Sequence, residues 1–311
     1  MRIDERAYSH HAAPCTVHRA YPAFVTAGTI RPNPAKQVLP AHMSNIPAVN
    51  SLITAINFDR FAEIEAHHRQ DAVFQSFRGP TLRDSVGIAD WHREFLRDYA
   101  DCNYAELEYI EESASVAVRG TIEAKAYDWR PFTQRIIEVF TFDDAGEVAQ
   151  RRLYGMLRDI EFDKPATASL TDAMGFKGGS ASATRATVQK FYDALLSGDR
   201  DGALEQLHDK ATCIDGVYGI ANGSANILDF LRQIPMPAFG QIRVTNILAG
   251  EHDALVELAI DPARPRFADW VRVVDGKIRV IEGYAMLREL GVNPYENYAG
   301  DRHRRQVIMP M

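Results

Sequence analysis

The chain contains the segment Tyr154-Gly-Met-Leu-Arg-Asp-Ile160 and, 130 residues later, the segment Tyr284-Ala-Met-Leu-Arg-Glu-Leu290. All seven positions match by identity or close similarity. Each segment follows a strand pattern and a turn that combines aspartate with glycine, at Gly146 and at Gly276. The period is far longer than the roughly 20–50 residues of solenoid repeats. We therefore infer two related globular domains in tandem.

The composition is typical of a globular protein and narrows the choice of partners. The chain has 311 residues, a length that fits two domains, and 46% of them are hydrophobic. A formal net charge of -7 argues against nucleic acid and anionic membranes as partners. No apolar run approaches the roughly 20 residues that span a bilayer. The three cysteines lie in separate segments and the N-terminus lacks a secretory pattern, so we expect a cytoplasmic protein.

Local composition divides the chain into five parts. Residues 1–46 are rich in proline and predict an irregular extension, and residues 163–182 have the composition of a linker. The first domain is predicted at 47–162 and the second at 183–290, with a polar C-terminal tail at 291–311.

Both domains have the same predicted order of elements: two helices, a short strand, a third helix and a meander of four strands. Helices followed by an antiparallel meander predict an α+β fold, with helices packed on one face of a curved, mostly antiparallel sheet. Such a cone-shaped domain offers a pocket for a small molecule between sheet and helices. The meander strands are expected at 104–110, 116–127, 133–142 and 148–160, and again at 241–248, 254–260, 267–274 and 277–287.

Two acidic residues stand at equivalent places in these meanders. In the strand 267–274 side chains alternate between faces, so Asp269 shares a face with apolar neighbours. Desolvation there would raise its pKa, and a protonated carboxyl can donate a hydrogen bond to an oxyanion. A strand shifted by one residue, or an aspartate bonded to a loop, would explain the pattern without function. Glu138 occupies the matching inward position of the first domain.

A third acidic residue, Asp215, ends the short strand 211–215 and precedes Gly216. An aspartate beside a glycine most often forms a turn, and a catalytic role is the alternative. The first domain has Ser76 at this place, so it lacks the second acid.

The segment from Val188 to Ala203, followed by Asp209-Lys-Ala-Thr-Cys-Ile-Asp-Gly216, resembles the opening of the ketosteroid isomerase family. That family shares the nuclear transport factor two-like fold with the SnoaL-like polyketide cyclases. The resemblance implies that Asp215 is a general base and Asp269 the protonated acid of an oxyanion hole. The family's oxyanion tyrosine aligns with Phe191, and Tyr192 is expected to point about 100° away.

The first domain is similar to the SnoaL-like side, through Trp129-Arg-Pro-Phe-Thr-Gln-Arg135. Tyr154 and Tyr284 occupy the same point of the last strand and either line the cone or pack in the core. With Phe191, Tyr192, Phe230 and Glu138 they complete the predicted substrate-binding set. His67 and His68 are expected at a solvated helix end.

The sequence hypothesis is a cofactor-free isomerase, cyclase or dehydratase that acts on an apolar enolisable carbonyl compound. Relatives often dimerise through the open face of the sheet, so we expect the two domains to form an intramolecular pseudo-dimer, with association of further copies left open. No cofactor or metal is expected. The alternative is a non-catalytic binding or assembly module, in which Asp215 would face solvent at the turn and Asp269 would pair with Arg272 or another cation. A third hypothesis makes the first domain active, through Glu138 with His92 or Asp128.

Overall fold

The computed structural model describes residues 44–77, 80–126, 131–156, 179–215, 219–233, 242–261, 264 and 266–286. All of them belong to one compact unit, His42–Met311. The predicted tail at 291–311 and most of the predicted extension and linker lie outside the described residues. The first half contains α1 (Ile46–Asn57), α2 (Phe61–Ala66), β1 (His68–Ser76), α3 (Ser85–Asp98), β2 (Tyr99–Glu112), β3 (Ser115–Ala126), β4 (Pro131–Phe142) and β5 (Val148–Gly155).

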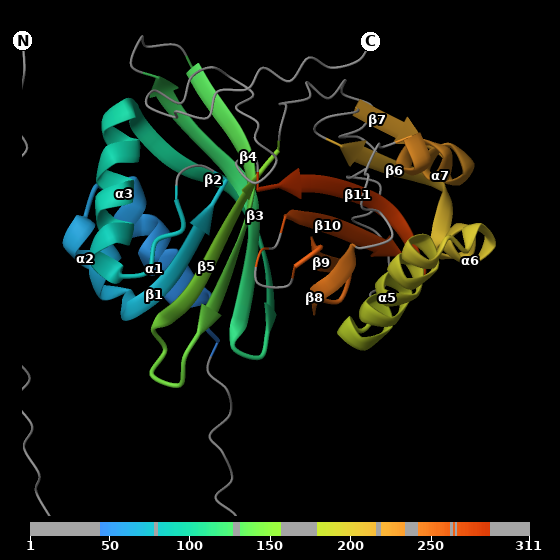
Figure 1. Ribbon diagram of the computed structural model, residues 1–311, viewed down its shortest axis with the longest axis horizontal. Coiled ribbons are helices and arrows are strands. Elements are labelled where there is room, and N and C mark those ends of the chain that lie inside the picture. Colours follow the sequence, from blue (N-terminus) through green and yellow to red (C-terminus); the bar gives the residue numbers. More distant parts are fainter. Residues whose placement is uncertain are drawn as a thin grey trace, which may run out of the picture. The chain divides into compact units, whose positions relative to one another are not determined.

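The second half repeats this order (Figure 1). It contains α5 (Ala181–Ser197), α6 (Arg200–Gln206), β6 (Leu207–Asp215), β7 (Gly219–Asn222), α7 (Ser224–Gln233), β8 (Arg243–Ala249), β9 (Asp253–Ala259), β10 (Phe267–Val274) and β11 (Lys277–Ala285). The α+β prediction is confirmed. Two details differ: β6 begins at Leu207 instead of at residue 211, and β7, which follows the turn expected after Asp215, was not predicted.

The strands are hydrogen-bonded in the order β2-β3-β4-β5-β11-β10-β9-β8. All neighbours in this series are antiparallel, whereas β1 runs parallel to β5 and β6 runs parallel to β11. The two halves meet in the series through the pair Ala285 and Gly155. Figure 1 shows α1, α2 and α3 together on one side of the first-half strands.

Side-chain alternation along the strands gives each half two buried faces. One face packs against the half's own helices and forms its hydrophobic core. The other faces of both halves share a third core, which includes Trp270 and Tyr284 of the second half and Ile137 and Tyr154 of the first. The sheet-to-sheet contact expected between the halves is thus present in the structure.

Helix α5 is held firmly at both ends. The Ser180 side chain accepts from the Ala183 amide at 3.2 Å, which caps the first turn. Gly198, with φ of 81°, ends the helix in the left-handed conformation that glycine adopts at little cost. The Thr184 hydroxyl donates to the Glu251 carbonyl at 2.7 Å and anchors the helix to the loop between β8 and β9. These contacts fix the helix face that carries Tyr192.

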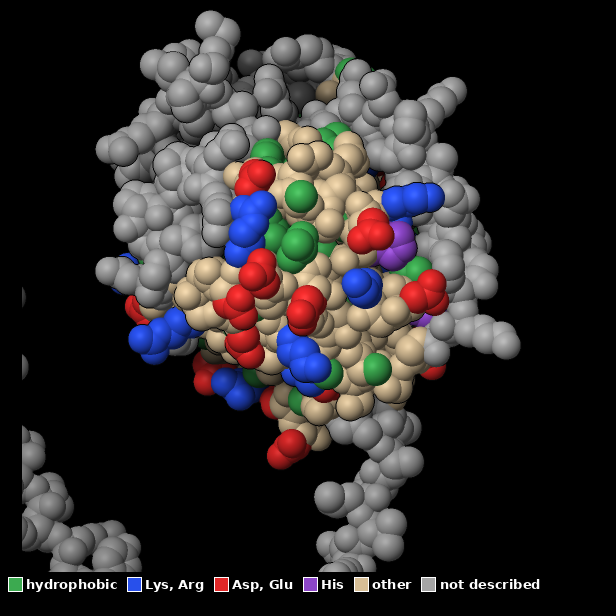
Figure 2. Space-filling view, turned by 90° about the vertical axis from the view of Figure 1, so that its right-hand side faces the viewer, with side chains coloured by type: hydrophobic (Ala, Val, Ile, Leu, Met, Phe, Trp, Pro, Cys, Tyr) green, Lys and Arg blue, Asp and Glu red, His purple; other side chains and the backbone are tan. Residues whose placement is uncertain are grey.

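One face of the molecule is mixed in charge. Figure 2 shows Asp and Glu side chains interspersed with Lys and Arg side chains around a small group of hydrophobic side chains. A nucleic-acid-binding surface, in contrast, gathers basic side chains on one face. Among the described residues no helix is both long and apolar enough to cross a membrane.

Trp270 lies at the centre of the core shared by the two halves, 1% exposed, with the Arg119 guanidinium 5.5 Å from its ring centroid. Trp270→Ala should lower the free energy of unfolding by about 3–5 kcal/mol, because it removes the largest buried side chain and leaves a cavity. Urea denaturation measures the loss. Phe58→Ala is the control, since Phe58 is 67% exposed and its truncation should change stability little. Equal effects of the two substitutions would contradict the packing described here.

Candidate active site

Three neighbouring strands bring Asp215 and Asp269 together around a glycine. Asp269 of β10 pairs with Gly283 of β11, and Gly283 pairs with Asp215 of β6. Residues paired directly across strands point to the same face of a sheet. A Cβ placed on Gly283 would lie 3.5 Å from Asp215 Oδ2 and 3.5 Å from Asp269 Oδ1. The two carboxyl groups therefore border one gap, which exists because residue 283 has no side chain.

Both aspartates are half-buried, so each keeps part of its surface accessible. The face that they share also carries the core residues Cys213, Val271 and Ile281, which pack toward the helices. The two acids thus stand at the end of an apolar surface that a small organic molecule could contact.

Tyr192 reaches this pair from α5. Its hydroxyl donates to Asp269 Oδ2 at 2.5 Å, and its ring is 2% exposed. Burial, reinforced by the neighbouring Asp269, raises the pKa of Tyr192 well above its ordinary value, so the hydroxyl stays protonated. Tyr192 was expected about 100° around the helix from Phe191, and it still reaches Asp269. The buried face of α5 is wide enough to hold Phe191 and Tyr192 side by side, with ring centroids 5.1 Å apart.

The Asp269 carboxyl has the most distinctive electrostatics of the site. Burial raises its pKa from 3.8 to about 7. The hydrogen bond from Tyr192 favours the ionised form and lowers the pKa, and the charge of Asp215 raises it again. Because Oδ2 accepts from Tyr192, Oδ1 is the oxygen that faces the gap above Gly283. At neutral pH a large share of the molecules carries Asp269 as a carboxylic acid.

The remaining predicted substrate-binding residues of the second half divide between the two faces of the sheet. Phe191 is fully buried in the helix-side core, and Phe230 packs half-buried against it. Tyr284 was predicted to line the pocket, and the structure places it elsewhere. It follows Gly283 in β11, so it points to the opposite face, into the core between the halves. Its hydroxyl donates to Glu282 Oε2 at 3.0 Å.

Arg272 does not form the ion pair with Asp269 that the alternative hypothesis predicted. The Arg272 guanidinium donates to Asp253 at 2.8 Å and to Glu108 at 3.0 Å, on the other face of β10. This difference in face leaves Arg272 unable to hold Asp269 in its charged form.

The strand register identifies the equivalent place in the first half. Glu138 of β4 pairs with Leu153 of β5, and Leu153 pairs with Ser76 of β1. The predicted equivalence of Glu138 with Asp269 and of Ser76 with Asp215 therefore matches the observed pairing. Leu153, which is fully buried, stands where the second half has Gly283. The gap between the acids of the second half is thus filled in the first.

Glu138 has a different partner from Asp269. It is fully buried and forms an ion pair with Arg151, whose Nη1 donates to His92 Nε2 at 2.7 Å. Burial raises the pKa of Glu138, and Arg151 acts against that shift. Burial lowers the pKa of His92, which is therefore neutral, and Arg151 reinforces this. The first half pairs its buried acid with an arginine, whereas no cation among the described residues pairs with Asp269. Asp128 lies outside the described residues.

Two further predictions for the first half need correction. Tyr154, predicted to bind substrate, donates to Glu257 Oε1 at 2.5 Å in the core between the halves, because it lies on the same face as Tyr284. His68, expected at a solvated helix end, is 4% exposed and begins β1, where its Nδ1 lies 2.7 Å from the Ile64 carbonyl oxygen.

The sequence hypothesis missed Gly283 and Arg151. Gly283 lies one residue before Tyr284, inside the repeated strand that the sequence aligns with Leu153, so a glycine opposite a leucine was a visible signal. Arg151 is an arginine on an inward strand position, and its pairing with Glu138 depends on register, which the sequence alone leaves open.

Comparison with known proteins identifies the second half. Residues 188–281 match the family model of the SnoaL-like domain. This part of the chain has a SnoaL-like fold of the NTF2-like type. The match covers α5 from Val188 onward through most of β11 and includes Asp215, Asp269 and Tyr192. The first half repeats the strand order and register of this SnoaL-like domain, as the pairings above show.

Solved structures that match each correspond to less than half of this chain. A candidate polyketide cyclase from Pseudomonas putida matches with 14% identity over 36% of this chain and 92% of that chain, with a TM-score of 0.34. An NTF2-like protein of unknown function from Burkholderia pseudomallei matches with 20% identity over 41% and 98%, with a TM-score of 0.34. TerC, co-crystallised with polyporic acid, matches with 19% identity over 41% and 98%, with a TM-score of 0.33. TM-scores of this size support no inference about function. No curated protein matches the chain.

The raised pKa of Asp269 makes folding stability depend on pH. The folded protein holds this proton more tightly than the unfolded chain, so the free energy of unfolding should fall as pH rises. The fall due to this group should be roughly 2–4 kcal/mol between about pH 4 and pH 7, and level off above. Asp269→Asn should remove this part of the pH dependence in urea titrations. The exposed Asp209→Asn should retain it, and an unchanged slope in Asp269→Asn would refute the assignment.

The buried pair of the first half predicts an asymmetric response to substitution. Arg151→Met should lower the free energy of unfolding by about 3–5 kcal/mol, because it leaves Glu138 buried without a cation. The double variant Glu138→Gln with Arg151→Met should lose less, since no charge is left unpaired. Guanidinium denaturation of both variants at pH 7 measures the difference. A double variant as unstable as the single one would mean that the charge of Glu138 is not what costs stability.

Proposed function

We propose that the SnoaL-like second half catalyses cofactor-free proton transfer on an apolar, enolisable carbonyl compound, such as a polyketide, terpenoid or steroid-like ketone. The observation that carries this proposal is the pair Asp215 and Asp269 on either side of Gly283, with Tyr192 bound to one of them. The two acids have different surroundings, which suits one for the role of base and the other for the role of acid.

Asp215 is the proposed general base. Its Oδ2 faces the gap and would take a proton from the carbon next to the substrate carbonyl. The electrons of the broken C–H bond then form the enolate, and negative charge develops on the carbonyl oxygen. The protonated Oδ1 of Asp269 faces the same gap and would donate a hydrogen bond to that oxygen.

Tyr192 would position Asp269. By occupying Oδ2 it holds the carboxyl plane and directs the other oxygen toward the substrate. The proton on Asp215 can return to a different carbon, which is isomerisation. It can instead protonate a leaving hydroxyl, which is dehydration, or pass to the alkoxide that forms when the enolate carbon attacks a second carbonyl, which is cyclisation. The two carboxyl groups serve all three outcomes, and the substrate determines which one follows.

The competing hypotheses have less support from the geometry. The binding-module hypothesis expected Asp269 to pair with Arg272 or another cation. Arg272 pairs with Asp253 and Glu108, and among the described residues Asp269 interacts with Tyr192 and Asp215. The hypothesis of an active first half needs an acid that faces an open space, whereas the Glu138 carboxyl is bonded to Arg151 and the equivalent gap is filled by Leu153.

The proposal predicts exchange of α-protons in D2O. Wild-type protein incubated with a panel of cyclic ketones should catalyse deuterium incorporation next to the carbonyl, measured by NMR. Asp215→Asn should reduce the exchange rate by about 10²–10⁴-fold, because it removes the base, while ligand binding, measured by saturation-transfer NMR, persists. Ser76→Ala, at the equivalent place in the first half, should leave the rate unchanged. Binding without exchange in the wild type would favour the non-catalytic alternative.

The pH profile of the same exchange distinguishes the role of Asp269 from a structural one. The rate should decline above about pH 7, as Asp269 loses the proton that it donates. Asp269→Asn keeps a hydrogen-bond donor without an ionisable group, so its lower rate should lack this decline. An identical decline in both proteins would assign it to another group.

A further inference from the structure

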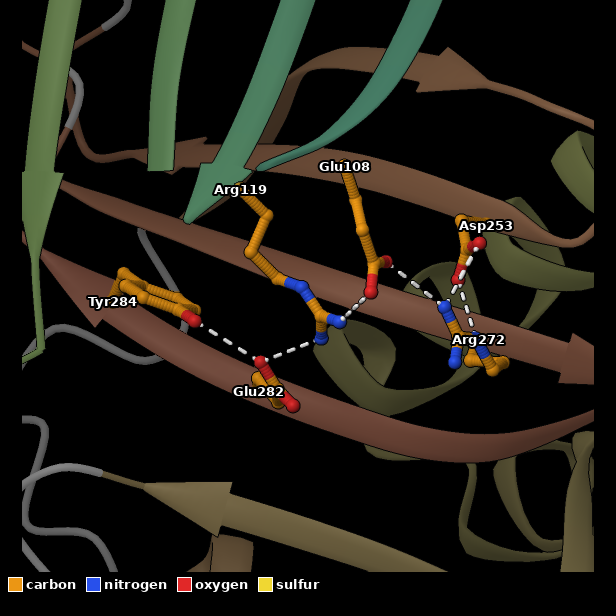
Figure 3. A network of polar contacts seen from close by, with 6 residues as sticks. All are labelled: Glu108, Arg119, Asp253, Arg272, Glu282 and Tyr284. Atoms are coloured by element: carbon orange, nitrogen blue, oxygen red, sulfur yellow. Dashed lines mark hydrogen bonds and ion pairs between the residues drawn. The ribbon is translucent and has the colours of Figure 1, made fainter. Parts of the chain in front are cut away.

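Two buried ion pairs cross the boundary between the halves. Arg119 of β3 places Nη1 2.9 Å from Glu282 Oε2 of β11. Arg152 of β5 places Nε 2.6 Å from Glu257 Oε1 of β9, and Nη2 2.9 Å from Oε2. Figure 3 shows the first pair within a network that joins strands of both halves. The Glu257 and Glu282 side chains are 2% and 5% exposed, so water contributes little to their stabilisation.

Strand register shows that the two pairs occupy equivalent positions. Arg119 lies opposite a β4 residue that in turn lies opposite Tyr154 of β5. In the same way, Glu257 lies opposite a β10 residue that in turn lies opposite Tyr284 of β11. Arg119 and Glu257 are therefore equivalent. Arg152 and Glu282 each lie two residues before the equivalent tyrosine, so they are equivalent as well. At both positions an arginine of the first half stands where the second half has a glutamate.

The side chains that neighbour these charged residues also differ between the two halves. Glu108 is paired with Arg119 across β2 and β3, and it accepts from the guanidinium at 2.6 Å. The residue equivalent to Glu108 is Asn246, which is paired with Glu257 and donates to it at 2.9 Å. The neighbour of the positively charged arginine thus accepts a hydrogen bond, and the neighbour of the negatively charged glutamate donates one. Both tyrosines donate to the glutamate of a pair, Tyr154 to Glu257 and Tyr284 to Glu282.

The apolar part of this interface gives little directional selection of its own. Both faces contribute aliphatic residues and one tyrosine at the same point to the shared core, and the second half adds Trp270 where the first half has Val139. Hydrophobic burial is non-directional. The polar positions, where the sign of the charge is reversed, therefore supply the directional discrimination between the other half and a second copy.

We infer that the reversed charges make each sheet face complementary to the other half of the chain and repulsive to a second copy of itself. A pair of first halves in this arrangement would set Arg119 against Arg152. A pair of second halves would set Glu257 against Glu282. Like charges that lose their water without gaining a partner strongly disfavour association. The interface therefore selects a first half joined to a second half, and it rejects both like-with-like pairings between copies of the chain.

Charge exchange within the full-length chain tests this inference. The variant R119E/E257R sets like charges against each other at both boundary pairs, and it makes the like-with-like pairings attractive. The controls R119E/E282R and R152E/E257R each reverse one pair and keep opposite charges in contact. All three exchange one arginine and one glutamate, so the formal net charge stays at -7. R119E/E282R also shares with the test variant the loss of Arg119 beside Glu108 and Trp270.

Sedimentation velocity and urea denaturation provide the readouts. R119E/E257R should lower the folded-to-unfolded ratio at least about 100-fold more than either control, and its remaining folded protein should associate as concentration rises. The quadruple variant R119E/R152E/E257R/E282R restores opposite charges at both pairs and should recover stability and the wild-type sedimentation. R119E/E257R behaving like its controls would overturn the inference. So would a quadruple variant no better than R119E/E257R, which also decides the matter if R119E/E257R fails to fold.

Discussion

The two-sided burial of β11 is the constraint on which the rest of the structure depends. Its side chains alternate, so Glu282 and Tyr284 must face the other half while Gly283 faces the helices of its own half. A shift of one residue would exchange these sets and place charged groups in the apolar core. The ion pairs between the halves and the gap between Asp215 and Asp269 are therefore set by the same register.

The same register shows how two halves with one fold differ in chemistry. Where the second half leaves a gap at Gly283, the first fills it with Leu153, and where the second has the aliphatic Ile281, the first has Arg151. This arginine forms an ion pair with the buried acid of the first half. Among the described residues the acid of the second half has a tyrosine and another carboxylate as neighbours, and its burial, reinforced by the charge of Asp215, keeps its pKa far above the ordinary value.

Strand order, helix positions and the equivalence of Glu138 with Asp269 could be predicted from the sequence, because period-two alternation and a repeated terminal strand are local signals. The position of Tyr192 could not. A helix buries a face whose width is decided by the partners it packs against, and a difference of 100° between neighbours does not exclude both from that face. The tyrosines at 154 and 284 were assigned to the pocket because the sequence does not reveal which sheet face meets another sheet.

The Asp269 carboxyl keeps its proton up to about pH 7 while it shares a gap with Asp215. The most direct measurement is a pH titration of the aspartate carboxyl carbons by ¹³C NMR, with Asp269→Asn used to assign the signal. The account predicts that Asp269 titrates near pH 7, and that Tyr192→Phe moves this transition to higher pH, because the hydrogen bond that favours the ionised form is lost. A transition near pH 4 in the folded protein would contradict the account.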